Sequence, residues 1–202
     1  MRRANLATAF VFSAASIVGA VQQTTLAERV RQQRGNIEVL LLNEYSPVQL
    51  RELIKACDLL VRVVVSDNGH SYLTKDAQDI ESEFTVQVID RYFLSPASQP
   101  GEKILVAIPG GTLTIDGYKV TSRENDLPPF RANEEYILML KRDPSTRQYL
   151  LPYGAQSAFR ITGGDIEQVS KKFGTWNRER GRVPVVDFIK ELTSLIPAGQ
   201  AR

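Results

Sequence analysis

Side chains that commonly carry catalytic chemistry are scarce in this 202-residue chain, which has one histidine and one cysteine. His70 lies in a polar run with Ser66, Asp67 and Ser71, which contains the residue types of a Ser-His-Asp triad. Neighbours along one loop seldom present triad geometry, and the sequence has no Gly-x-Ser-x-Gly motif. We therefore interpret His70 as a polar turn residue.

The same scarcity bears on metal binding. Cys57 and His70 supply at most two good zinc ligands, where structural sites use four and catalytic sites three. We predict neither a metal nor any other cofactor. Cys57 lies in an apolar run, which predicts a small buried side chain; a reactive or intermolecular thiol is the alternative.

An acidic cluster at Asp76, Asp79, Glu81 and Glu83 is the next candidate. It lacks the glycine and the spacing of an EF-hand loop. Glu81 and Glu83 would share one face of a strand with their Cβ atoms roughly 6.5 to 7 Å apart, so geometry alone does not forbid a pair of hydrolytic carboxylates, although no aromatic sugar platform lies beside them. A solvated strand face is the simpler interpretation, and a weak cation site is the other alternative.

Cations and aromatic residues alternate near the C-terminus. This patch could bind an anionic polymer by charge and stacking, although Glu179 interrupts it. The alternative is a solvated linker in which Trp176 packs onto the body of the protein. The candidate ligand-binding residues are Lys171, Lys172, Trp176, Arg178, Arg180 and Arg182, with Phe173 between them.

The N-terminus has the pattern of an export signal. Arg2 and Arg3 precede an uncharged, largely apolar run that ends in the small residues Val18, Gly19 and Ala20. We predict cleavage after Ala20, with an uncleaved anchor as the alternative; either places the rest of the chain outside the cytoplasm, secreted or periplasmic. Cleavage would leave 23 basic and 23 acidic side chains, a balance that does not favour specific nucleic-acid binding.

The predicted elements are mostly strands joined by glycine and proline turns. One short helix is expected within 25–33, and a second from the Ser46-Pro47 cap to Cys57. A third is expected from about Pro184. The strands are expected at 37–42, 59–65, 80–92 with a bend near Asp90, 104–108, 112–115, 136–140, 149–151, 155–161 and 166–169, with a hairpin at Asp116-Gly117.

This spacing predicts a mainly β fold, a small OB-like barrel with one helix before it and one after it. With one cysteine, the barrel has no internal disulfide. The predicted organisation is a signal peptide at 1–20, an N-terminal helical extension at 21–57, the barrel at 58–170, and a basic linker with a C-terminal helix at 171–202.

Three runs carry a resemblance to a known group. They are Pro100 to Gly111, Phe130 with Glu134 to Leu140, and Tyr149 with Gly154 to Phe159. Over about residues 58–170 the chain resembles exported bacterial proteins whose core is similar to the TIMP-like (netrin-related) OB barrel. The resemblance implies a non-enzymatic binding barrel.

The animal inhibitors with this barrel chelate the zinc of their target through an N-terminal cysteine and are held together by disulfides. This chain has neither feature, and its predicted mature N-terminus is Val21, so protease inhibition and its residues are not carried over. We expect a non-catalytic binding module with a protein or an envelope polymer as partner. The alternatives are an envelope-polymer hydrolase that uses the acidic cluster, and a structural envelope protein.

Overall fold

The computed structural model describes residues 24–42, 45–95, 100–172, 176 and 182–196. Strands make up 45% of the chain and helices 19%, so the expected mainly β class is confirmed. The predicted export signal at 1–20 lies outside the described residues, and so do Arg178 and Arg180 of the predicted basic patch. No helix within the described part of the chain is long and apolar enough to cross a membrane.

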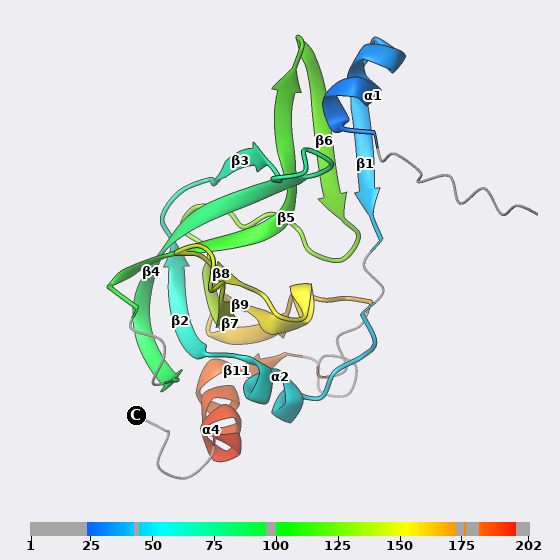
Figure 1. Ribbon diagram of the computed structural model, residues 1–202. Helices are drawn as coiled ribbons and strands as arrows, with labels where there is room; N and C mark the ends of the chain where they lie inside the picture. Colours follow the sequence, from blue (N-terminus) through cyan, green and yellow to red (C-terminus); the bar gives the residue numbers. More distant parts are fainter. Residues whose placement is uncertain (1–23, 43–44, 96–99, 173–175, 177–181, 197–202) are drawn as a thin grey trace, which may run out of the picture.

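Five strands form the closed barrel at the centre of Figure 1. Antiparallel pairs join β5 to β4, β4 to β2, β2 to β7 and β7 to β8, and a parallel pair between β8 and β5 closes the ring. The strands are β2 (Leu59–Val65), β4 (Ile80–Leu94), β5 (Lys103–Ile115), β7 (Glu135–Arg142) and β8 (Tyr149–Leu150). The prediction of a small barrel is therefore confirmed.

The apolar run of β2 is buried on both faces of the barrel wall. Val61 and Val63 point into the barrel interior, whereas Leu60 belongs to a second core outside it. Side chains alternate between the two faces of a strand, so a continuous apolar run is needed where both faces are covered. β4 shows the predicted irregularity near Asp90, because its pairing with β2 skips Ile89 and Tyr92.

The barrel interior is closed at one mouth by a loop. Leu127 and Phe130, from the segment that joins β6 (Tyr118–Glu124) to β7, are buried in the same core as Phe84 and Tyr136. The ring of Phe130 lies 5.4 Å from that of Phe84 and 4.7 Å from that of Tyr136. This proline-containing loop is thus part of the core.

A three-stranded arm projects from the barrel (Figure 1). The second half of β5 pairs with β6 (Tyr118–Glu124), and β1 (Ile37–Leu41) pairs with β6 in parallel. The expected turn at Asp116-Gly117 is present, and both residues have positive φ. Helix α1 (Leu26–Gln33) packs Leu26 and Val30 on the arm and begins with a capping box at Thr25.

The break that we expected between 108 and 112 is wrong. β5 runs through Pro109, Gly110 and Gly111, and there passes from the barrel sheet into the arm. A Cβ on Gly111 would lie closer than 3.0 Å to the hydroxyl oxygens of Ser82 and Ser71, and the Ser82 Oγ donates to the Gly110 carbonyl at 2.8 Å. The glycines therefore allow the strand to bend across these hydroxyls.

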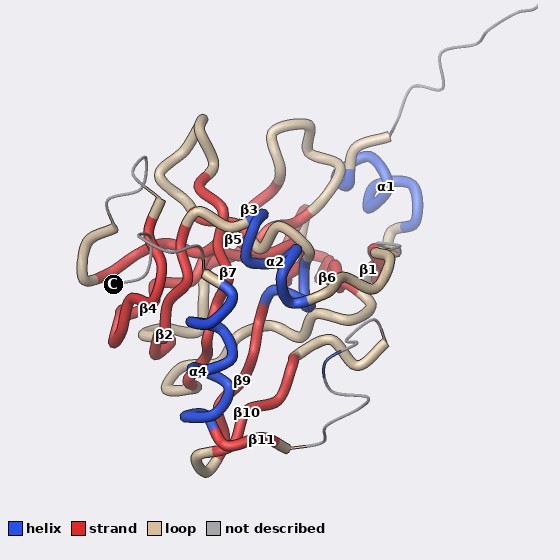
Figure 2. The backbone as a smooth tube through the Cα atoms, turned by 90° about the horizontal axis from the view of Figure 1, so that it is seen from below, coloured by secondary structure: helices blue, strands red, loops and turns tan. Residues whose placement is uncertain are grey.

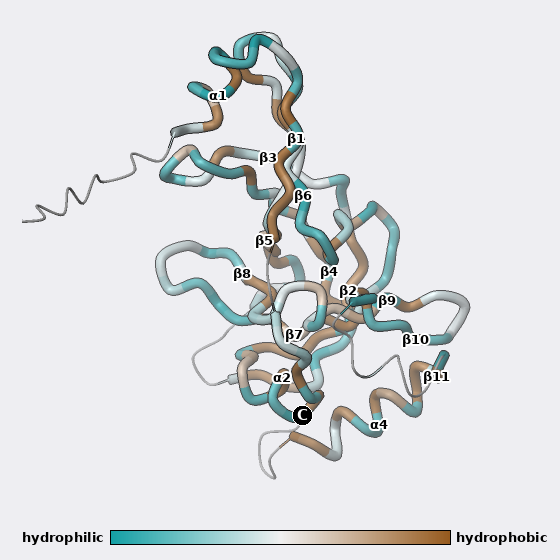
Figure 3. The backbone as a smooth tube through the Cα atoms, turned by 90° about the vertical axis from the view of Figure 1, so that its right-hand side faces the viewer, coloured by the Kyte–Doolittle hydropathy of each residue, from teal (hydrophilic) through white to brown (hydrophobic). Residues whose placement is uncertain are grey.

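The remaining helices cover the outside of the barrel. α2 (Leu50–Ala56) and α4 (Val185–Leu195) share a core with Phe159. In Figure 2 α4 runs beside β9 (Ala158–Thr162) and β10 (Asp165–Gln168), and Figure 3 shows hydrophobic residues recurring along it. The predicted start of α2 at Ser46-Pro47 is wrong, since the helix begins after Gln49. The Gln156 side chain bonds instead to the Val48 amide and the Ser46 carbonyl, which keeps this segment extended.

Short strands complete the sheet. A polar bend is present at Asp67 to Gly69, but the interpretation of His70 as a turn residue is wrong, because His70 begins a strand that pairs with β4. The strand predicted at 155–161 is preceded by a 3₁₀ turn that occupies its first residues. These elements are β3 (His70–Leu73), the turn at Gly154–Ser157, β9 (Ala158–Thr162), β10 (Asp165–Gln168) and β11 (Val183–Pro184).

Candidate functional site

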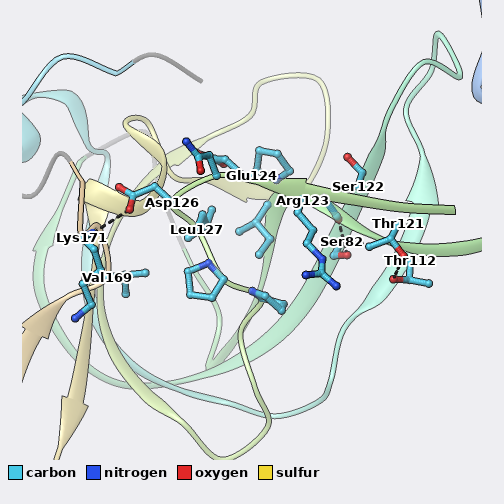
Figure 4. Close-up of a pocket in the computed structure, with 17 residues that line it drawn as sticks. Ser82, Thr112, Thr121, Ser122, Arg123, Glu124, Asp126, Leu127, Val169 and Lys171 are labelled. Atoms are coloured by element: carbon cyan, nitrogen blue, oxygen red, sulfur yellow. Dashed lines mark hydrogen bonds between the residues drawn. The ribbon is translucent and has the colours of Figure 1, made fainter. Parts of the chain in front are cut away.

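A pocket of about 650 Å³ lies where the arm leaves the barrel (Figure 4). Its described walls come from five segments: Ser82 of β4, β5 at its bend, the end of β6, the loop after β6, and the chain that follows β10. The bend at Gly110-Gly111 separates the arm from the barrel mouth, and the buried Leu127 fixes the loop at the opposite side. The pocket is therefore a direct consequence of the strand continuing through its glycines.

The floor of the pocket is apolar. It is formed by Ile108, Leu127, Pro128, Pro129 and Val169. Ile108 and Leu127 are buried members of the barrel core, so their positions are determined by packing. The two prolines have restricted backbone angles, which limits rearrangement of this wall. The floor is thus preformed.

The rim is polar and carries both signs of charge. Arg123 and Lys171 supply positive charge, and Glu124 and Asp126 supply negative charge. The hydroxyls of Thr112 and Thr121 lie 3.3 Å apart across the β5–β6 pair. Figure 4 shows Arg123 and Lys171 from different walls of the pocket. This combination suits a ligand with an apolar body and a polar end.

Asp126 holds two walls together. Its carboxylate accepts hydrogen bonds from the backbone amides of Lys171 at 3.0 Å and Lys172 at 3.1 Å, and from the hydroxyl of Ser170. Hydrogen bonds to a charged acceptor are stronger than those between neutral groups. The chain after β10 is therefore fastened to the loop after β6, and the apolar floor between them keeps its shape.

Glu124 is buried at the inner edge of the rim. A Cβ on Gly154 would lie 2.8 Å from Glu124 Oε1 and 2.8 Å from Tyr45 Cε2, so the three residues are in close contact. Burial raises the pKa of the Tyr45 hydroxyl, and the nearby Glu124 carboxylate raises it further. Both effects keep Tyr45 protonated and able to donate a hydrogen bond.

The structure describes only part of the predicted basic patch. Lys171, Lys172 and Arg182 are exposed, while Arg178 and Arg180 lie outside the described residues. The Lys171 ammonium pairs with Glu167 in the strand before it. Among the members of this set that the structure describes, Lys171 alone lines the pocket described above.

The position of Trp176 corrects the prediction that its ring stacks on a bound polymer. Its side chain is 8% exposed and contacts Phe188 and Phe159 at ring-centre distances of 4.6 and 5.8 Å. The indole nitrogen donates to Glu191 at 3.4 Å. An indole enclosed by aromatic side chains in this way is not accessible to the bases or sugars of a polymer. The alternative interpretation, packing onto the body, describes its position.

Each side chain of the acidic cluster accepts a hydrogen bond from a different part of the protein. Glu81 accepts from the Tyr72 hydroxyl at 3.1 Å, and Gln148 donates to both Tyr72 and Glu83. Asp79 accepts from Ser122 at 2.7 Å, and Asp76 accepts from Thr74 at 2.6 Å, within its own turn. Glu81 and Glu83 thus share a face as predicted, but Asp76 and Asp79 bond elsewhere.

The single cysteine and the single histidine of the chain both lie in described segments. Cys57 is buried, and its thiol donates to the Ile54 carbonyl. Burial raises the pKa of this thiol to about 12, with a smaller contribution from Asp58. His70 is exposed and its ring lies 6.5 Å from that of Tyr72. Within the described ranges, no group of three or more His, Cys, Asp or Glu side chains could hold a metal ion.

Sequence reasoning identified one pocket residue, Lys171. Gly110 and Gly111 lie in the predicted gap between the strands at 104–108 and 112–115, and residues 125–131 lie between the predicted strands at 112–115 and 136–140. One signal was available: Leu127 and Phe130 are large apolar residues on either side of two prolines. Such residues in a loop indicate that it folds back onto a core.

The comparisons with known proteins add no relative. No family model, curated protein or solved structure matches the chain.

Proposed function

We propose that the protein is a non-catalytic binding protein and that the pocket between the arm and the barrel takes its ligand. The observation that carries this proposal is a preformed cavity of about 650 Å³ with an apolar floor and a polar rim. Small-molecule sites usually have about this size and composition. The ligand class is a small amphipathic molecule, or a short apolar segment of a larger one.

The rim suggests how such a ligand would be oriented. Its apolar body would cover Leu127, Pro128 and Val169, and its polar end would contact the charged side chains above them. Since the rim carries the hydroxyls of Thr112 and Thr121, which can each donate and accept, it suits a head group that both donates and accepts hydrogen bonds. The floor is already ordered, so little conformational entropy is lost there on binding.

The hydroxyl groups of the pocket support binding over catalysis. The Ser82 hydroxyl donates to the Gly110 carbonyl, and the Ser122 hydroxyl donates to Asp79. A serine nucleophile needs a base placed to take its proton, usually an imidazole. The side chain of the single histidine, His70, lies on the opposite face of β3 from that of Ser71, since successive side chains of a strand point to opposite faces.

The site of action that we propose is outside the cytoplasm. The charged start and apolar run before Val21 support it. N-terminal sequencing of protein recovered from the extracytoplasmic fraction is expected to begin at Val21. Recovery of the full chain from the cytoplasm alone would contradict this part of the proposal.

Binding can be tested with a fluorescent amphiphile, 8-anilinonaphthalene-1-sulfonate, titrated into the folded protein. Thr121→Trp places a bulky ring at the pocket wall, where it would displace part of the ligand from the apolar side chains. We expect this loss of apolar contact to weaken binding about tenfold. Thr114→Trp is the matched control, since Thr114 is exposed on the same arm outside the pocket. Equal affinity of the wild type and both variants would show that the pocket is not the binding site.

A further inference from the structure

A second pocket of about 320 Å³ lies beside the parallel β5–β8 pair, and the charged side chains that the structure describes in its lining are all positive. Lys103, Arg142 and Arg147 line it together with Thr85, Gly101 and Tyr149. The three cations come from the start of β5, the end of β7 and the turn that follows. No Asp or Glu is part of the lining that the described residues provide.

Two of these cations have no carboxylate partner within the part of the chain that the structure describes. Among the residues that the structure describes, neither Lys103 nor Arg147 forms an ion pair. Like charges gathered at one pocket repel one another, so this arrangement costs stability in the free protein. A bound anion would remove that cost, and an arginine fork suits the oxygens of a phosphate group.

Three carboxylates bonded to the segments around this pocket have partners within the protein. Asp143 accepts from the amide and hydroxyl of Ser145 and from the hydroxyl of Thr146, and these bonds lower its pKa. Asp58 accepts from the backbone amide of Arg142 at 3.0 Å. Glu83 accepts from Gln148. These acids order the chain around the pocket without lining it.

The turn that carries Arg147 is held in place from two sides. The Asp143 amide donates to the Gln148 carbonyl at 3.0 Å, which closes the turn. Gln148 then reaches across to the Tyr72 hydroxyl at 3.0 Å, which ties the turn to β3. Arg147 therefore extends from an ordered backbone, as a preorganised binding site requires.

We propose that this second pocket binds a phosphate group, with Lys103, Arg142 and Arg147 as its ligands. The site is separate from the pocket proposed above, and neither depends on the other. The phosphate could belong to a small soluble molecule or to the head group of a lipid, since the chemistry recognised is the same.

The probe for the soluble source is inorganic pyrophosphate, titrated by isothermal calorimetry at low ionic strength. Arg147→Gln and Lys103→Gln are each expected to weaken binding about tenfold, the scale of one charge-assisted hydrogen bond. Arg147→Lys keeps the charge without the planar fork, and its affinity for pyrophosphate is expected to lie between that of the Gln variants and that of the wild type. Arg51→Gln is the control, because Arg51 is an exposed cation on α2 outside the pocket.

The lipid source is tested by sedimentation with vesicles of phosphatidylcholine alone or with phosphatidic acid added. Binding that requires phosphatidic acid and is lost in Arg147→Gln would assign the phosphate to a membrane. Binding of pyrophosphate alone would assign it to a soluble molecule. If neither probe binds, or if the Gln variants bind both probes as well as the control does, the proposal is wrong.

Discussion

The ring of Trp176 contacts that of Phe188 at a centre-to-centre distance of 4.6 Å and an interplanar angle of 62°, which joins the chain after β10 to helix α4. An aromatic residue that the sequence places among cations is thus a core residue. We expect Trp176→Ala to lower the free energy of unfolding by about 3 to 5 kcal/mol, the usual cost of removing a large buried aromatic side chain.

Two measurements check this prediction. Urea unfolding gives the change in stability, with Lys172→Ala as the control, expected within about 0.5 kcal/mol of the wild type as an exposed site. Because the chain has one tryptophan, its fluorescence reports on this site alone. Iodide should quench the native emission weakly; strong quenching would place the indole in solvent.

Gly111 marks the bend on which the first pocket depends. It has φ of 143° and lies against Ser82 and Ser71, whereas Gly117 has φ of 82° and nothing within 4 Å of its Cβ position. Gly117→Ala should therefore cost about 1 to 2 kcal/mol through backbone strain alone. Gly111→Ala should cost about 2 kcal/mol more, because its methyl group is also overpacked. Thermal unfolding of the two variants measures the difference, and equal melting temperatures would contradict a tight bend.

The buried thiol of Cys57 links stability to alkaline pH. Its pKa rises from 9.0 in the unfolded chain to about 12 in the folded protein. The folded state therefore holds the proton more tightly, so this contribution is fully present below pH 9 and is lost as the pH rises toward 12. Burial raises the pKa of Tyr92 to about 12 as well, and acts in the same direction.

The contribution of Cys57 is separated by substitution. Urea unfolding at pH 7 and pH 10.5 should show a smaller alkaline loss of stability in Cys57→Ala than in the wild type. In the native wild type at pH 8, the thiol should react with a disulfide reagent far more slowly than in urea, since the thiolate is the reactive form. Rapid reaction of the native protein would mean that the thiol is accessible.

Glu81 and Glu83 allow the hydrolase alternative to be tested. Their bonds to Tyr72 and Gln148 indicate a structural role, so purified wild-type protein is expected to leave labelled envelope polysaccharide uncleaved. Glu81→Gln and Glu83→Gln should lower stability by about 1 kcal/mol each, the cost of losing one charged hydrogen-bond partner. Cleavage by the wild type that disappears in both folded Gln variants would replace binding with hydrolysis as the function.

Much of the local structure followed from sequence patterns. The β-branched run at 59–65 became β2, the alternation after Ile80 became β4, and Asp116-Gly117 formed its turn. These patterns are readable because side-chain alternation and turn geometry depend on residues close together in the chain. The start of α2 was misplaced because Gln156, far away in the sequence, bonds to the segment at Ser46 and Val48.

What the amino-acid order determined by itself was the position of most strands, of the Asp116-Gly117 turn and of the apolar helix faces, since these patterns depend on residues close together in the chain. Tertiary structure alone decided that the two-residue β8 closes the barrel by pairing in parallel with β5. It also decided that Trp176 is buried and that Lys103 shares a pocket with Arg147. Both candidate sites join segments distant in the chain, and such contacts depend on how the whole sheet curls, which no local pattern encodes.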